Sequence, residues 1–422
     1  MINKISLGQF NIFYIYIILY VNTLILNNFL FGQSYNDIFS EVKFFPSEIQ
    51  KVFSTHYFFH QIIFCFFTCL LAILQSLYKK IFNTERKRSL SKFKLLYYDY
   101  EKEIKTKISF IDYILTVFIM IIEEQFLEKI FFYLFSYVDF WMIELIIITY
   151  INSKMFNSKI YKHHMFAIIL NVTIPLTLKI ITIIYSDKKI DPNKNYLMLI
   201  LGIIIYLIAI ILRSLINSRI KYYMDLKYIS EEKILILYGF LGGLLFLIYS
   251  IITSILHKKE DECLPHFDKT MFLENISQYF QIFGCKGFTK IELLKELLII
   301  FIGSVCLFYK KYLFLLIIKY LTPVHIIFSY SIYNMFEKLL LMLNTLINLG
   351  RFFKTNELTL KTKFILDISG DIVSILCYII YLEVIEFHCC KLDYNIKNNI
   401  IMRSIKDVNN LDETFSTELE EN

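Results

Sequence analysis

The chain has 422 residues, of which 56% are hydrophobic and 19% are charged. This composition is typical of a protein with several membrane-spanning segments, because a soluble core needs fewer apolar side chains. The net charge of +6 is small for this length, and lysine and arginine gather at the ends of apolar runs. We therefore expect the lipid bilayer as a partner and no nucleic acid.

Ten apolar runs follow one another along the chain. With its flanks, each run approaches the roughly 20 helical residues that are needed to cross about 30 Å of hydrocarbon. The runs show no alternation with a period of two residues, which argues against membrane-spanning strands. The sequence predicts an all-α polytopic membrane protein with about ten transmembrane helices, at Phe10–Phe31, Tyr57–Tyr78, 108–122, 140–151, 163–184, Tyr196–Ile216, Ile234–Leu256, Glu292–Tyr320, Thr322–Ile347 and Phe364–Ile385.

The distribution of lysine and arginine predicts an orientation. Three basic connectors, after the second, fourth and sixth runs, fall on one side of the membrane if there are ten crossings. Loops rich in Asp and Glu, including the segment Glu123 to Glu128, fall on the other side. Both termini are then cytoplasmic, and residues 391–422 form a cytoplasmic polar tail.

The longest connection between runs, residues 257–291, is expected on the lumenal or extracellular side. It contains Cys263 and Cys285, which form a disulfide in an oxidising compartment or are two unrelated thiols. It also contains Asn275 in an Asn-Ile-Ser sequon, which predicts a glycosylation site. We expect no metal site and no cofactor.

Several segments resemble one branch of the drug/metabolite transporter superfamily, the F-type and chloroquine-resistance-transporter-like members of solute carrier family 35. The second run, which includes THYFFHQIIFCFFTCLLAIL, is similar to that family's second helix, and FIDYILTVFIMII to its third. The segment from Phe140 through the basic connector to the fifth run resembles the family's fourth and fifth helices. LILYGFLGGLL and KYLTPVHIIFSYSIYN resemble two helices of its second half. The family's Arg-Gly in helix four is replaced here by Glu144-Leu145.

The resemblance implies two five-helix repeats, residues 1–190 and 191–390, around a central cavity at mid-membrane. It implies a solute transporter that works by alternating access and performs no enzymatic reaction. On this basis we expect the cavity to be lined by Asp112, Trp141, Glu144, Tyr330, Asn334 and Asp371. Such acidic groups suit a cationic or proton-coupled small-molecule solute. The family favours an endomembrane location, in the Golgi, endoplasmic reticulum or vacuole, over the plasma membrane.

Other interpretations stay open from the sequence. Because Glu144 stands where the family has arginine, a non-transporting scaffold or receptor-like protein with the same fold is the main alternative. The chain contains no Walker loop, GxSxG, HExxH or CxxC motif, which argues against an enzyme. Single residues also have structural interpretations: Asp112 as an interfacial carboxylate, Trp141 as an anchor at the membrane interface, and Glu337 with Lys338 as an internal ion pair. The sequence does not predict an oligomeric state.

Overall fold

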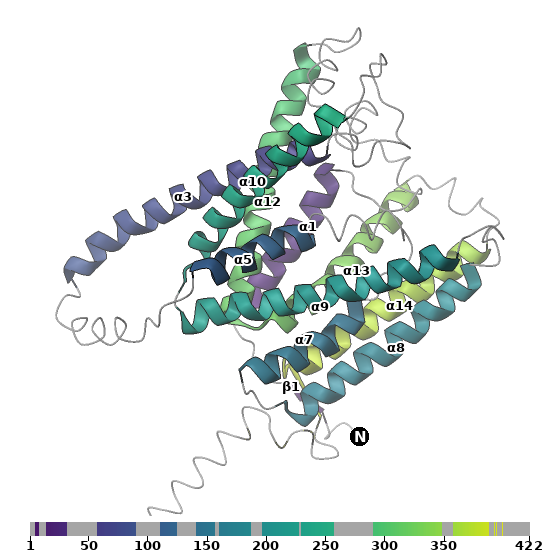
Figure 1. The fold of residues 1–422 in the computed structure, drawn as a ribbon. Coiled ribbons are helices and arrows are strands. Elements are labelled where there is room, and N and C mark those ends of the chain that lie inside the picture. The colour runs from purple at the N-terminus through teal and green to yellow at the C-terminus, as the bar shows by residue number, and fades with distance from the viewer. Residues whose placement is uncertain are drawn as a thin grey trace, which may run out of the picture. The chain divides into compact units, whose positions relative to one another are not determined.

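The structure is a computed structural model of the full chain (Figure 1). It describes residues 5–7, 14–31, 57–89, 110–124, 141–156, 160–186, 196–227, 229–256, 290–347 and 358–387, with residues 392, 394 and 399. The predicted disulfide pair Cys263 and Cys285 and the sequon at Asn275 lie outside the described residues. So does the predicted polar tail, residues 391–422, except for the three single residues given above.

The described residues are almost entirely helical, which confirms the all-α prediction for this part of the chain. They form ten α-helices and two short strands, and each helix corresponds to one of the ten predicted apolar runs. The helices are α1 (Ile15–Phe31), α3 (Tyr57–Ser89), α5 (Phe110–Ile122), α7 (Trp141–Met155), α8 (Lys162–Ser186), α9 (Tyr196–Leu226), α10 (Glu231–Leu256), α12 (Lys290–Tyr320), α13 (Pro323–Ile347) and α14 (Leu358–Tyr381).

Two helices continue well beyond their apolar runs. α3 extends through the charged segment KKIFNTERKRS, and α9 extends ten residues past Ile216. Lysine, arginine and glutamate are good helix formers, so a helix can continue after its apolar stretch ends. The last run behaves differently, because α14 ends at Tyr381 and strand β2 (Ile385–Phe387) follows it.

Three of the described helices contain stretches that are long and apolar enough to cross a membrane, which indicates a membrane protein. These stretches are His60–Ile81 of α3, Glu231–Ile255 of α10 and Ile300–Tyr320 of α12. Shorter apolar stretches lie in α1, α5 and α14. The ten-crossing arrangement remains a prediction.

The chain divides into two compact units, each built from segments that are distant in sequence. Unit 1 contains residues 1–14, 139–194 and 327–422, and unit 2 contains residues 15–138 and 195–326. Each unit takes helices from both halves of the sequence. This grouping does not test whether residues 1–190 and 191–390 are structural repeats, so the two-repeat division also remains a prediction.

Unit 2 is organised around the three membrane-length helices. α3 packs along α10, while α12 contacts α1 and α3. The α3–α10 contact is close because glycines of α10 face α3. A Cβ atom added to Gly239 would lie 2.5 Å from the backbone oxygen of Cys65 and 2.6 Å from the backbone nitrogen of Cys69. Small residues let two helix backbones approach in this way.

In unit 1, α8 packs along α14 and also contacts α7 (Figure 1). The α8 and α14 helices are antiparallel, since the start of α8 lies beside the end of α14: the rings of His164 and Tyr381 are 4.5 Å apart. Strand β1 (Ile5–Leu7) pairs antiparallel with β2, with Ser6 opposite Glu386. The start of the chain is thereby joined to the segment that follows its last described helix.

Candidate functional site

Unit 2 contains two groups of ion pairs between its apolar helices, and in each group at least one carboxylate is buried. The first group, which we call the end tier, consists of Lys79, Glu231, Glu232 and Lys319. The Nζ of Lys79 lies 3.1 Å from Oε1 of Glu231 and also contacts Glu232. The Nζ of Lys319 lies 2.7 Å from Oε2 of Glu231. Glu231, which is 4% exposed, is therefore the centre of this tier.

The second group, the inner tier, consists of Glu123, Glu124, Arg213 and Lys311. Oε1 of Glu123 accepts a hydrogen bond of 2.9 Å from Nε of Arg213, and Nη2 of the same guanidinium lies 2.8 Å from that oxygen. Lys311 of α12 pairs with Glu124, and the hydroxyl of Tyr238 donates to the same carboxylate at 2.9 Å. Four helices, α5, α9, α10 and α12, contribute to this tier.

The two tiers lie at different depths along the same helices. Tyr238 follows Glu231 by seven residues on α10, and Lys311 precedes Lys319 by eight residues on α12. At 1.5 Å per residue these separations are about 10 and 12 Å. The end tier occupies the ends of the three membrane-length stretches, whereas Tyr238 and Lys311, which contact Glu124 of the inner tier, lie deeper inside two of them. Each tier has two acids and two bases, so its formal charges balance.

Buried polar groups also occur in unit 1, along the contact between α8 and α14. Asn171 of α8 is fully buried, and neither atom of its amide has a hydrogen-bond partner among the described residues. Gly370 lies beside Pro175, and His164 beside Tyr381, so the antiparallel register places Asn171 level with Ser374 of α14. The Ser374 hydroxyl is likewise buried without a described partner.

No protein-family model matches this chain, and no curated protein is significantly similar to it. The arguments about its function therefore rest on its own residues.

The six predicted cavity residues fall in both units. Glu144 and Asp371 are buried in unit 1, on α7 and α14, while Tyr330 and Asn334 lie half-buried on α13. Trp141 begins α7 in the same unit, and its side chain is outside the described part. Asp112 belongs to unit 2, where it opens α5. The shared cavity stays a prediction.

Asp112 makes contacts typical of a structural residue. Its Oδ1 is 3.0 Å from Arg219, and its Oδ2 accepts a hydrogen bond of 2.6 Å from Tyr223. The Asp112 side chain is 38% exposed and that of Arg219 is 44% exposed. This exposure supports the interfacial interpretation of Asp112.

We therefore expect Asp112→Asn to lower the free energy of unfolding by less than about 1 kcal/mol, because exposed ion pairs contribute little and Asn still accepts the tyrosine hydrogen bond. Thermal unfolding of detergent-purified protein checks this. A loss as large as that of a buried pair would contradict the peripheral role.

Sequence reasoning missed both tiers. It placed Glu123 and Glu124 in an acidic loop, whereas the structure shows them in a wide helical turn directly after α5, where Glu123 is buried and Glu124 is partly buried. The signal was a basic residue inside each of two apolar runs, namely Lys311, which follows Lys310, and Arg213. A basic residue there needs an acidic partner.

Proposed function

We propose that this chain is a multi-pass membrane transporter for a small charged solute. The inner tier is the observation that carries the proposal, because it joins two acids and two bases among apolar helices, and its Lys311 lies inside a stretch long enough to cross a membrane. Ionisable residues at such depth are costly, and in membrane proteins they usually face a water-filled path or a binding site.

The chemistry of the inner tier suits a solute that exchanges with internal ion pairs. Lys311 and Glu124 neutralise one another when no solute is present. An anionic group of a solute can take the place of Glu124 beside Lys311, and a cationic group or a proton can take the place of Lys311 beside Glu124. Because the tier is balanced, either exchange changes its net charge by a single unit, the charge that the solute brings.

The end tier supports a path that reaches the membrane surface. Its residues come from the ends of three apolar stretches. Lys79 lies at the end of the α3 stretch, Glu231 begins the α10 stretch, and Lys319 lies at the end of the α12 stretch. The lysine and arginine distribution assigns these three ends to the cytoplasmic side. We propose that the solute passes the end tier before it meets the inner tier, and that alternating access exposes the inner tier to each side. Ten crossings and an endomembrane location belong to the same proposal.

The proposal predicts that Lys311→Gln reduces solute uptake at least tenfold. The substitution removes the cation of the inner tier while keeping a side chain of similar length. Uptake is measured in proteoliposomes with a panel of nucleotide sugars, amino acids, organic anions and cationic drugs, with and without an imposed pH gradient. Lys233→Gln is the matched control, because Lys233 is exposed on α10 and outside both tiers.

A charge swap separates transport from stability. Lys311→Glu combined with Glu124→Lys keeps an ion pair of opposite polarity, so the swapped protein should fold but should still fail to transport. Wild-type uptake by the swapped protein would assign the pair a structural role. Failure of the wild-type protein to move any solute in the panel would favour the scaffold alternative.

A further inference from the structure

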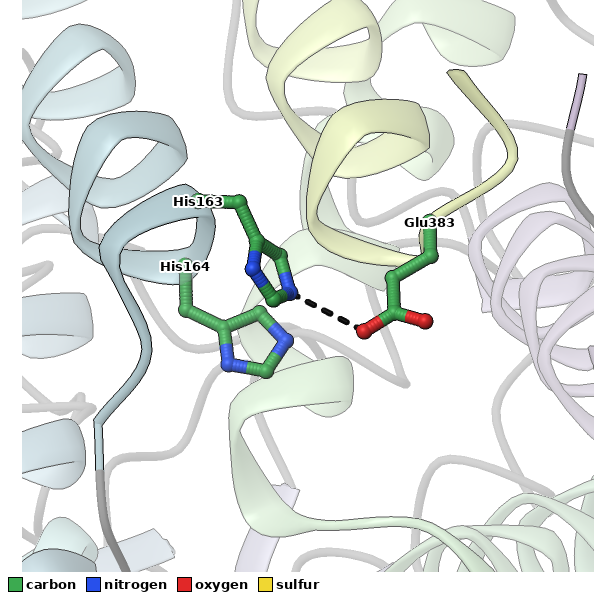
Figure 2. A group of neighbouring side chains, drawn as sticks. All are labelled: His163, His164 and Glu383. Atoms are coloured by element: carbon green, nitrogen blue, oxygen red, sulfur yellow. Dashed lines mark ion pairs between the residues drawn. The ribbon is translucent and has the colours of Figure 1, made fainter. Parts of the chain in front are cut away.

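We propose that unit 1 contains a zinc-binding site formed by His163, His164 and Glu383. One ligand atom from each of these residues lies within 4.8 Å of the others. Figure 2 shows both imidazole rings on the first turn of α8, with the Glu383 carboxylate facing them from the turn after α14. Two imidazoles and one carboxylate form a ligand set that is common for Zn²⁺, with a fourth position left for water.

The burial of His163 is an independent indication of a ligand. Its residue exposure is 3%, and neither ring nitrogen has a hydrogen-bond partner in the described part of the chain. Its Nε2 lies 3.0 Å from Oε1 of Glu383, although the two groups lack the alignment of a hydrogen bond. Buried imidazole nitrogens normally find a partner, and a metal ion between Nε2 and the carboxylate would provide one.

The spacing of the ligands suits a small ion. Zinc bonds of 2.0–2.2 Å in a tetrahedron place the ligand atoms about 3.4 Å apart. The pair formed by His163 and Glu383 is already close to this spacing, and a side-chain rotation brings the His164 nitrogen in. The ring centroids of the two histidines are 4.0 Å apart, so protonating both would place like charges together. Neutral imidazoles bound to a metal avoid that repulsion.

The backbone around Glu383 is held in an uncommon conformation. Glu383 has φ of 59°, in the left-handed region where glycine is usual. Its amide donates to the carbonyl of Ile380, and that of Val384 to Ile379, so Glu383 occupies the left-handed position of a Schellman motif that ends α14. A glutamate held at a glycine position is a strained feature of the kind found at binding sites.

Neighbouring contacts fix both sides of the site. Strand β1 pairs with β2 directly after Glu383, and the Tyr14 hydroxyl donates to the Leu382 carbonyl at 3.2 Å. His164 packs on Tyr381, which in turn packs on the fully buried Phe328. The positive end of the α8 dipole opposes a cation at this place. The anionic Glu383 offsets that effect, which makes the carboxylate essential to the site.

The test is zinc binding by the full-length protein in detergent after metal is removed by a chelator. We expect one Zn²⁺ per chain by competition with a fluorescent zinc indicator, together with a zinc-dependent rise in the unfolding temperature. Mg²⁺, which prefers an all-oxygen site, should give neither. Glu383→Gly and His163→Ala should each weaken binding at least tenfold, and His325→Ala, a buried histidine of unit 2, should leave it unchanged.

Glu383→Gly is the most informative variant, because glycine suits the backbone at this position. It should unfold at the wild-type temperature or above when zinc is absent, and it should lose the zinc-dependent rise. Zinc binding of wild-type strength in both Glu383→Gly and His163→Ala would overturn the proposal, as would the absence of any zinc-dependent shift in the wild-type protein. The site does not depend on transport, so neither result bears on the inner tier of unit 2.

Discussion

Replacing Arg213 with leucine should destabilise the folded protein by about 3 kcal/mol or more, one of the two largest single-residue effects that we expect. The substitution leaves Glu123, which is 2% exposed, without the guanidinium that contacts it through two nitrogens. Removing one partner of a buried ion pair typically costs about 3–5 kcal/mol, because the remaining charge stays buried and loses its main opposite charge. Unfolding of the detergent-purified variant by heat or denaturant measures the loss.

The matched double variant shows whether the pair itself is responsible. Arg213→Leu combined with Glu123→Leu removes both charges, and apolar replacement of a whole buried pair is often neutral or stabilising. The double variant should therefore recover most of the stability lost in the single one. If the double variant is less stable than Arg213→Leu alone, the loss does not arise from separating Glu123 from its guanidinium partner.

Enlarging Gly239 should have the second large effect. A methyl group at this position would lie 2.5–2.6 Å from backbone atoms of α3, which cannot move aside as a flexible side chain can. Overpacking of a close contact usually costs about 1–3 kcal/mol, and we expect the upper end here because α3 and α10 must separate along their length. Gly239→Val should reduce the yield of folded protein and its unfolding temperature in detergent.

Gly370 provides the control for this prediction. It is also a buried helical glycine, but a Cβ atom there would meet its nearest neighbour, Pro175, at 3.8 Å. This is an ordinary contact distance, and alanine has a higher helix propensity than glycine. Gly370→Ala should therefore be neutral or slightly stabilising, while Gly239→Ala should already be harmful. Equal behaviour of the two alanine variants would contradict the close α3–α10 packing.

The helices were predictable from sequence because long apolar runs are a local property. All ten predicted runs correspond to described helices, and α10 and α12 were predicted to within three residues at each end. The ends of α3 and α9 were missed because hydropathy falls where the helix continues with charged residues. The end of α14 was missed because Val384 and Ile385 continue the apolar pattern through a turn.

The candidate sites were much less predictable, because they depend on partners far apart in sequence. Lys311 and Glu124 are separated by 187 residues, and Arg213 and Glu123 by 90. Each of these residues also has a plausible local interpretation, as a helix boundary or a loop. The histidine pair at the start of α8 lies in a segment that was interpreted only through its resemblance to the family's fourth and fifth helices. Its third partner, Glu383, follows it by 220 residues and was taken as part of an apolar run.

The pairing of α8 with α14, and of β1 with β2, also sets the order in which the protein can be assembled. During synthesis the ribosome produces Ile5–Leu7 and α8 long before their partners emerge, since β2 begins only at Ile385. Asn171, Ser374 and the histidine pair therefore cannot be enclosed until α14 and β2 have been translated. Unit 1 must wait for α14, its last described helix, whereas all the described helices that belong wholly to unit 2 have been translated by Tyr320.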